Sequence, residues 1–536
     1  MADQDLPKPV SLIRTYLLGG MLILEFFLLL LNGNHMLPMG WSDFLFVSLL
    51  LLAFALYRPG WSFLLFVGSI PLENIILFDK LANVRPYQLL GLVTLLAIIT
   101  RFFWKRLNFS LPKLHWSDAL FVLLGVASVL SALGSVERSA SLKQSLVLGS
   151  FILLYALTRI FVQNLDDLKR VFSFFLASSV PVVLYGLWQN MRFAAKLESF
   201  EIMPGRPNAT FSEPDWLGIY LVFVVAVLFA TIFHLRDDQP HHSDELRSRN
   251  FELLWAYSYL VPVLALLIIT VSRSAWAGVF FLAVVFLITI LTNLSLKVIE
   301  WDWKGFFKTV RNLIAALTLS VLVVIAFNLT TFQLFNRASS TGSGLQKITV
   351  ACREVAQCGN TLCALPKTIS GVAELEQYGC RHINLENVTS EQATGATIRE
   401  VERPDPNIGI RGRIYRQSLE IIRQHMILGI GWGSIGAALG TDARGTSLNS
   451  SNIFLEVWLG TGVVGFGALL ILWLYLVIRS MVMVRSGEMT RRMVGMFVLL
   501  GSVALLVPNL FNAGIFLGVL WVFWGVVISL VNDENL

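Results

Sequence analysis

Long apolar runs of about 16–25 residues recur along most of the chain, which is the length an α-helix needs to cross a bilayer. Short polar segments separate them. The pattern predicts fourteen membrane-spanning helices, which start near Leu12, Phe44, Trp61, Tyr87, Asp118, Leu142, Val171, Trp216, Leu253, Ala275, Val310, Ser451, Met493 and Ile515. The third is the weakest because it contains Pro71, Glu73 and Asn74, so we expect it to be kinked or re-entrant.

A long polar stretch between residues 330 and 450 interrupts this pattern. It divides the chain into an N-terminal transmembrane bundle of about eleven spans at 1–329, a long loop at 330–450 and C-terminal spans at 451–536. The predicted fold class is an all-α integral membrane protein with about 12–14 transmembrane helices and one long structured loop. Composition agrees, because 55% of the residues are hydrophobic and 14% are charged, against roughly 25% charged in a soluble domain.

The long loop itself has two parts. Asn336–Asn407 is polar, and its sequence predicts no particular secondary structure. Arg411–Ile427 is predicted to be an amphipathic helix, and its apolar face would carry Tyr415, Leu419, Ile422 and Met426. Arg411 falls on this apolar side. An arginine directed at the bilayer or the protein core requires an anionic partner.

Basic residues are distributed unevenly between the two sides that alternating spans define. With the N-terminus in the cytoplasm, the cytoplasmic segments hold 21 Lys and Arg residues and the short outer loops hold 8. The long loop holds the remaining 12 of 41 and is left out, because the positive-inside rule applies to short loops. The bias predicts that both termini are cytoplasmic and the long loop is extracytoplasmic. The net charge of +6 is scattered between apolar runs, which argues against nucleic acid as a partner.

All four cysteines lie in the long loop, at Cys352, Cys358, Cys363 and Cys380. An even number of cysteines in one water-facing segment indicates two disulfides in an oxidising compartment, with three possible connectivities. The alternative is a zinc site made of four thiolates. The spacing lacks the CxxC pairs that are typical of zinc sites, which favours the disulfides.

Charged groups gather at the predicted outer ends of several spans. Arg273 lies in TVSRSAW, between the ninth and tenth spans, and one interpretation is an arginine whose side chain reaches the lipid headgroups. Arg206 precedes Glu213 and Asp215 in RPNATFSEPDWLGIYL, for which a helix-capping segment is the alternative. Arginine suits phosphate because its guanidinium stays charged and can donate two parallel hydrogen bonds.

The twelfth span opens with polar residues in NSSNIFLEVWLGTGVVG. Ser451 and Asn452 are residue types that commonly cap a helix. Glu456 lies one turn inside the span, where a carboxylate is costly unless it faces a cavity or a partner. Arginines and an acid at one membrane face predict a phosphate-containing lipid substrate.

Four segments together resemble the superfamily of O-antigen ligases and O-antigen polymerases, which are bacterial integral membrane glycosyltransferases. RPNATFSEPDWLGIYL is similar to the family's TF-x-EPN segment, and TVSRSAWAGVF is similar to its SR-a-w segment. RGRIYRQSLEIIRQHMILGIGWGSIG resembles its R-x3-W … HP-x2-G-x-G segment, and NSSNIFLEVWLGTGVVG its HN-x-x-L … E-x-G-x-x-G segment. The order and spacing match over about residues 200–480.

The resemblance implies an inverting glycosyl transfer from a polyprenyl-diphosphate-linked glycan at the outer face of the bacterial cytoplasmic membrane. It implies no cofactor and no required metal. The acceptor would be another glycan in a polymerase, and a lipid or a protein in a ligase. Arg273 and Arg411 would bind the diphosphate and stabilise it as it leaves. Further candidate substrate-binding residues are Arg413, as an alternative to Arg411, and Tyr415, Arg206 and Glu213.

The chain departs from the ligase pattern at the catalytic position. Ser451 stands where the ligases have the histidine that activates the acceptor, and a neutral serine is a poor general base. Gly460 also replaces the family's usual glutamate, and Tyr415 its usual tryptophan. The missing histidine favours the polymerase type. Glu456 is then the nearest candidate base, and Asn452 is expected to orient groups at the site.

The leading prediction is a polysaccharide polymerase that joins lipid-linked repeat units, with a chain-length regulator as an expected partner. The alternatives are a ligase and a multi-span transporter or flippase. Transporters usually carry charged residues near the membrane midplane and often show repeated halves. Here the span centres are nearly free of charge and no internal repeat is visible, which favours chemistry at the membrane surface.

Overall fold

The computed structural model of the chain describes residues 12–80, 83–106, 111–203, 205–237, 243–292, 299, 301–329, 345–352, 357–358, 361–362, 365–383, 388–404, 406–441 and 447–532. The chain forms two compact units. Met1–Leu329 and Ser418–Leu536 make up the first, called the transmembrane unit below, and Thr330–Gln417 makes up the second, called the loop unit.

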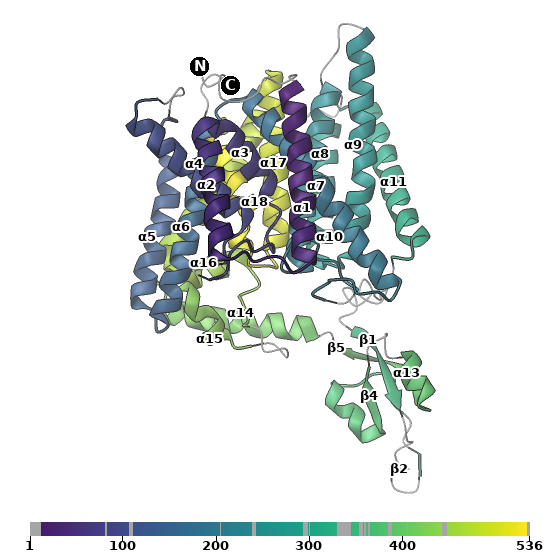
Figure 1. Cartoon of the computed structure of the whole chain (residues 1–536). Coiled ribbons are helices and arrows are strands. Elements are labelled where there is room, and N and C mark those ends of the chain that lie inside the picture. Colours follow the sequence, from purple (N-terminus) through teal and green to yellow (C-terminus); the bar gives the residue numbers. More distant parts are fainter. Residues whose placement is uncertain are drawn as a thin grey trace. The chain divides into compact units, whose positions relative to one another are not determined.

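Each of the fourteen predicted spans corresponds to a helix of the transmembrane unit (Figure 1). They are α1 (Leu12–Gly33), α2 (Trp41–Tyr57), α3 (Pro59–Ser69), α4 (Pro86–Phe103), α5 (Trp116–Gly134), α6 (Arg138–Phe161), α7 (Leu165–Ala194), α8 (Pro214–Asp237), α9 (Ser243–Ile269), α10 (Arg273–Thr292), α11 (Trp303–Ala326), α16 (Ile453–Val484), α17 (Met489–Asn509) and α18 (Gly518–Val531). Among the described residues, eleven helices are long and apolar enough to cross a membrane, and α2 and α18 are shorter apolar helices. The chain is therefore a multi-span membrane protein, as predicted.

The third predicted span is a short helix followed by a bend. α3 has 11 residues and ends at Ser69, ahead of the proline and the polar residues that made this span doubtful. In the bend, the buried carboxylate of Glu73 forms an ion pair with Arg85 at 2.6 Å. It also accepts a hydrogen bond from the Gly518 N–H at 3.1 Å. The carboxylate thereby joins the bend to the start of α18.

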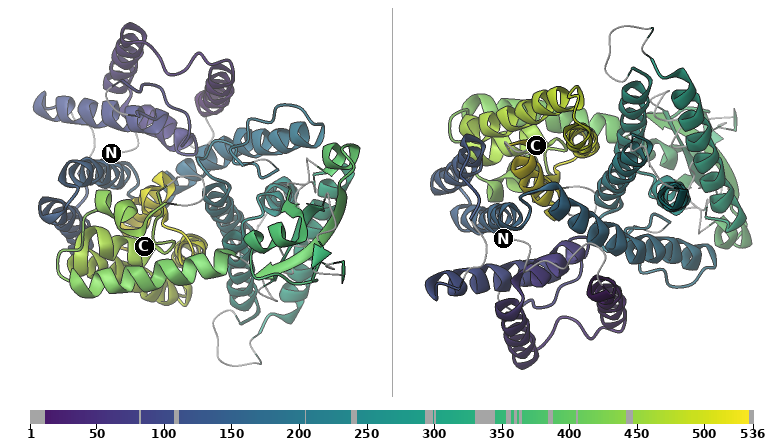
Figure 2. Two further views of the ribbon diagram at one scale, coloured as in Figure 1. Left: turned by 90° about the horizontal axis from the view of Figure 1, so that it is seen from below. Right: turned by 90° about the horizontal axis from the view of Figure 1, so that it is seen from above.

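Helices that are distant in the sequence pack side by side in the transmembrane unit. α16 packs against α5, α17 against α8 and α10, and α18 against α6, so the C-terminal helices lie next to both the early and the middle helices (Figure 2). In α8, 89% of the span is buried inside the protein, against 33% in α10, although both are equally apolar. Lipid tails and leucine side chains are alike in polarity, so composition does not separate the two environments.

Charged side chains are also buried in this unit, mostly in pairs near helix ends. Arg159 lies 3.3 Å from Asp118, and Arg170 lies 3.3 Å from Asp167. Glu25 differs, because it is 1% exposed and lies well inside α1. It is an exception to the prediction that the span centres are nearly free of charge.

The polar insert of the loop unit contains a small sheet, which the sequence did not predict. The strands β1 (Leu345–Cys352), β4 (Cys380–His382) and β5 (Thr397–Pro404) form an antiparallel sheet in the order β4-β1-β5. Ile348, Val350 and Val401 form its small core with Leu375. The other elements are a hairpin of β2 (Gln357–Cys358) and β3 (Thr361–Leu362), the 3-10 helix η3 (Val372–Tyr378) and α13 (Val388–Ala393). The apolar alternation in β1 was the missed signal.

One of the predicted disulfides lies within the described residues. Cys352 of β1 and Cys380 of β4 are direct partners in the sheet and are joined by a disulfide. For the other two cysteines, Cys363 lies outside the described residues and only the backbone of Cys358 is described. The disulfide therefore joins two residues that are 28 positions apart in the sequence, next to the core of the sheet.

We expect Cys352→Ser to lower the free energy of unfolding of the loop unit by about 3–4 kcal/mol, because an open loop of this length gains chain entropy when unfolded. Limited proteolysis of the full-length protein in detergent, with and without reductant, measures this. With reductant present, wild type and the Cys352→Ser variant should be cleaved in this unit at the same rate. Labelling of Cys380 in denatured, unreduced wild-type protein would contradict the assignment.

Candidate functional site

The carboxylate of Glu456 lies buried in the first turns of α16. Its side chain is 8% exposed, and one oxygen accepts a hydrogen bond from the Ser450 N–H at 2.8 Å. Ser450 precedes the helix, and its hydroxyl donates to the carbonyl of Asn452 at 2.8 Å. A carboxylate inside an apolar bundle needs such partners, and this one also faces a cavity.

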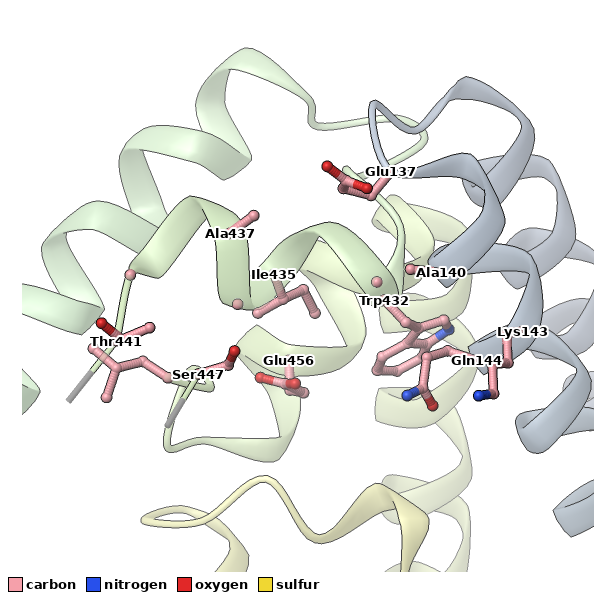
Figure 3. Close-up of a pocket in the computed structure, with 14 residues that line it drawn as sticks. Glu137, Ala140, Lys143, Gln144, Trp432, Ile435, Ala437, Thr441, Ser447 and Glu456 are labelled. Atoms are coloured by element: carbon pink, nitrogen blue, oxygen red, sulfur yellow. The ribbon is translucent and has the colours of Figure 1, made fainter. Parts of the chain in front are cut away.

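Glu456 lines an open cavity of about 660 Å3 in the transmembrane unit. Figure 3 shows its side chain among the cavity's other polar and aromatic groups, which are Glu137, Lys143 and Gln144 of the α5–α6 region, Trp432, Thr441 and Ser447. The sequence interpretation missed the α6 residues, because nothing in a span pattern links α6 to α16. Within the described residues, no three His, Cys, Asp or Glu side chains are placed to bind a metal ion.

Trp432 forms the aromatic wall of this cavity and is held rigidly. It opens the short helix η5 (Trp432–Ser434), which α15 (Ile435–Leu439) follows. Its indole N–H donates to the Ser128 hydroxyl at 2.8 Å, and its ring packs edge-on against Phe516 with centroids 5.2 Å apart. A side chain at Gly460 would collide with this indole ring. The glutamate that the ligase pattern has at this position therefore does not fit here.

The GIGWG segment, Gly429–Gly433, makes a tight turn beside α16. Gly429 has a φ of 71°, a conformation that L-residues other than glycine seldom adopt. The chain passes so close to α16 that a Cβ at Gly429 would collide with the helix backbone. The Ile430 N–H donates to the Leu459 carbonyl at 2.7 Å. This contact fixes Trp432 next to the turn of α16 that carries Glu456.

Asn452 caps α16 and ties it to the end of α17. Its side-chain oxygen accepts hydrogen bonds from the N–H groups of Phe454 and Leu455, and its amide donates to the Leu510 carbonyl at 2.9 Å. Ser451 has a φ of 50°, and its N–H donates to the Asn449 side chain at 2.9 Å. Asn452 thus holds the helix start in place, and both ends of its side chain serve that purpose.

Arg206 is buried, and it is bonded to protein groups. Its Nε donates to the Thr270 carbonyl at 2.9 Å, and its Nη2 lies 3.3 Å from Asp215 at the start of α8. Glu213, half-buried, lies before α8, and its carbonyl accepts the N–H groups of Trp216 and Leu217 at 3.2 Å. Arg206 therefore connects its loop to the turn that leads into Arg273.

Arg273 is the first residue of α10 and is half-buried. The next residue, Ser274, accepts a hydrogen bond from the Asn512 amide at 2.9 Å, and Asn512 lies two residues after Leu510. Three hydrogen bonds therefore connect these segments. Arg206 is bonded to Thr270 just before α10, and Ser274 of α10 is bonded to Asn512 after α17. Asn452 is bonded to Leu510, also after α17. Arg206, Arg273, Asn452 and Glu456 lie at the same end of the transmembrane unit, called the site end below.

The candidates Arg411, Arg413 and Tyr415 belong to the loop unit. They lie on α14 (Pro406–Gln424), which begins and ends earlier than the predicted helix at Arg411–Ile427. Arg411 and Tyr415 are half-buried one turn apart, and Arg413 is exposed. Burial raises the pKa of the Tyr415 phenol, and the neighbouring Arg411 guanidinium partly offsets this rise.

Only part of the predicted apolar face of this helix is buried within the protein. Leu419 and Met426 are 48% and 51% exposed, whereas Ile414, Ser418 and Ile422 are buried. These three residues are spaced four apart and share a face. Arg411 and Tyr415 do lie on the less exposed side, as predicted.

Comparison with known proteins agrees with the motifs. Residues 258–470 match the O-antigen ligase family, a range that contains Arg273, Arg411 and Glu456 and leaves out Arg206 and Glu213. No curated protein matches the chain. Members of this family are glycosyltransferases of the ligase and polymerase types, which transfer lipid-linked glycans. Residues 258–470 are therefore an O-antigen ligase family domain, set within a multi-span membrane protein.

Proposed function

We propose that the protein is a polysaccharide polymerase that joins polyprenyl-diphosphate-linked repeat units. The observation that carries this proposal is the buried carboxylate of Glu456 in a cavity beside Trp432, five residues beyond Ser451. Ser451 stands where the ligase pattern has its histidine. A cavity that already contains a carboxylate does not need that histidine to accept a proton.

In the proposed reaction, a hydroxyl of the acceptor glycan attacks the anomeric carbon of the donor sugar. The new glycosidic C–O bond forms as the C–O bond to the diphosphate breaks, with inversion. The hydroxyl proton passes to the Glu456 carboxylate, and the polyprenyl diphosphate leaves. Trp432 offers a flat apolar face for the acceptor sugar, and Gln144 and Lys143 offer hydrogen-bond donors.

Arg273 is the proposed contact of the leaving diphosphate. It opens a 20-residue helix, and the N-terminal end of a helix favours a negative charge. Arg411 is proposed for the same role from its motif alone, with Arg413 as its alternative. Arg206 is proposed to position the turn before Arg273, because its donors are bonded to Thr270 and Asp215.

The proposed location is the bacterial cytoplasmic membrane, with both termini in the cytoplasm and the site end outside. The excess of Lys and Arg in the segments that would face the cytoplasm, 21 against 8, supports this orientation. The disulfide in the loop unit supports it independently, because disulfides persist in oxidising compartments. The proposed partners are the lipid-linked donor, a glycan acceptor and other proteins of polysaccharide assembly.

The ligase remains the second candidate, since the family contains both types. A ligase passes its glycan to a lipid or a protein. The missing histidine at Ser451 favours the polymerase. The match to the O-antigen ligase family disfavours the transporter hypothesis, because members of that family transfer a glycan.

The test is a reaction in proteoliposomes that contain the purified protein and polyprenyl-diphosphate-linked repeat units. A ladder of products, each longer by one repeat, is expected on a gel. A single unit transferred to added lipid A or protein would favour the ligase instead. Solute uptake without any glycan product would overturn both enzyme assignments.

A further inference from the structure

A second cavity of about 280 Å3 opens in the transmembrane unit, apart from Glu456. Its walls come from the end of α1, the bend after α3, the C-terminal part of α7 and the loop between α7 and α8. The residues that matter for its chemistry are Asn32, His35, Asn74, Tyr185, Gln189 and Phe200. We call it the amide cavity.

The backbone around the amide cavity is unusually strained. His35, Phe200 and Ala209 line it and have φ values of 57°, 57° and 46°. They are three of the eight residues other than glycine with positive φ in the described part of the chain. Such conformations persist where the surrounding structure enforces them, and they concentrate at ligand sites.

One buried side chain enforces two of these conformations. Gln189 is 1% exposed, accepts a hydrogen bond from the Ala209 N–H at 2.7 Å and donates to the Phe200 carbonyl at 3.1 Å. Asn208 holds the same loop, since it accepts from the Ile202 N–H at 3.2 Å and donates to the Phe211 carbonyl at 2.6 Å. The cavity wall is therefore fixed before any ligand enters.

Aromatic rings form one wall of the cavity and are supported from behind. The Phe200 ring stacks on Trp188 with centroids 6.0 Å apart and planes 8° apart, and Trp188 also stacks on Tyr185 at 5.5 Å. The Arg192 guanidinium lies 5.0 Å from the Trp188 ring and 5.6 Å from the Phe200 ring. Phe200 is held in this position although it is 38% exposed.

Asn32 and Asn74 add polar groups without formal charge to the lining of the cavity. The side chains of Asn32 and Asn74 are exposed and make no hydrogen bond to the other described residues. No Asp, Glu, Lys or Arg is among the residues that line the cavity. A phosphate or an anionic headgroup would need cationic partners, whereas a sugar needs amides for its hydroxyls and a ring for its apolar face.

We infer that the amide cavity binds one neutral sugar residue of the glycan, so that the substrate is held at a point separate from its diphosphate. This inference rests on the proposed function for the identity of the glycan. The loop that carries Phe200 and Ala209 also carries Arg206, which is bonded to Thr270 three residues before Arg273. A single loop thus links the sugar-binding wall to the proposed diphosphate contact.

Binding of free oligosaccharide tests the inference without requiring transfer. The probe is an oligosaccharide of one to three repeat units, released from the polysaccharide of the cells that make the protein and freed of lipid and diphosphate. Calorimetric titration into the full-length protein in nanodiscs should show binding. Phe200→Leu, which keeps an apolar side chain without a ring, should weaken it by about tenfold.

Three further variants distinguish sugar binding in the amide cavity from a general effect of losing an aromatic side chain and from loss of glycan transfer. Phe200→Tyr restores the ring and should restore the wild-type Kd. Trp41→Leu removes an aromatic side chain that is 60% exposed at the start of α2 and does not line the cavity, so its Kd should stay unchanged. Arg273→Ala should lose transfer and keep oligosaccharide binding.

An equal Kd in wild type and Phe200→Leu would overturn the inference, as would a wild type that does not bind the oligosaccharide. A change only in the phospholipids that co-purify with Phe200→Leu would overturn it too, and would assign the cavity to a headgroup. Oligosaccharide binding without any transfer product would keep the sugar site and overturn the proposed function. If glycan transfer and oligosaccharide binding both stay unchanged in Phe200→Leu, the sugar site is overturned and the proposed function is kept.

Discussion

Replacing Arg273 by alanine is expected to slow glycan transfer by roughly 10²–10³-fold while the protein stays folded, which is the usual effect of removing one group that stabilises developing charge. Negative charge builds on the diphosphate as the glycosidic bond to it breaks. A guanidinium at the start of α10 acts on that charge together with the N-terminal end of the helix. The initial rate of ladder formation in proteoliposomes measures the loss.

Arg273→Lys keeps the charge and removes the paired donors, so its rate should lie between those of wild type and Arg273→Ala. Arg138→Ala is the matched control, because Arg138 is also the first residue of a membrane helix, α6, and is exposed. Its rate should equal that of wild type. Full activity in Arg273→Lys would exclude paired hydrogen bonds to the diphosphate, and full activity in Arg273→Ala would remove Arg273 from the site.

Glu456→Gln is expected to lower the transfer rate by about 10²–10⁴-fold, the usual contribution of a general base. Glutamine has nearly the same shape, and its side-chain oxygen can still accept the hydrogen bond from the Ser450 N–H. It cannot take a proton from the acceptor hydroxyl. The variant should therefore keep its fold and its affinity for the acceptor, and the loss should appear in kcat more than in KM.

A pH–rate profile distinguishes Glu456 as a general base from Glu456 as a residue that only supports the fold, because only loss of the base changes how the rate depends on pH. In wild type the rate should fall at low pH as the base becomes protonated, and this fall should be absent in Glu456→Gln. Glu488→Gln, an exposed carboxylate just before α17, serves as the control and should behave as wild type. If Glu137→Gln loses activity and Glu456→Gln keeps it, the base is Glu137 and the proposed mechanism is wrong.

Much of the fold could be predicted because membrane spans are a property of local composition. Each of the fourteen predicted spans corresponds to a helix, and the weak third span is a short helix that ends ahead of Pro71. The sheet of the loop unit was missed because its strands are short and pair over long distances, as Cys352 does with Cys380. The ends of α14 were misplaced by several residues, since amphipathic spacing does not mark where a helix starts or stops.

The candidate site was predicted in part. Glu456 was singled out because a carboxylate inside a span requires a polar environment, and it does face a cavity. Trp432, Lys143 and Gln144 were missed, because their relation to Glu456 depends on the packing of η5 against both α6 and α16. Arg206 was singled out for its charge, but its bonds to Thr270 and Asp215 are visible only in the folded chain.

By itself, the sequence determined that this is a multi-span membrane protein with a cysteine-containing loop and the motifs of the O-antigen ligase family. Hydrophobic length, residue type and short spacings contain that information. Only the tertiary structure decided which spans are enclosed, since α8 and α10 are equally apolar and one is buried while the other is largely not. It also decided that Trp432 lies over Gly460 and that Gln189 holds Phe200 and Ala209. These contacts join residues far apart in the chain, and in a membrane an apolar side chain is equally stable against lipid or protein, so local pattern cannot select between them.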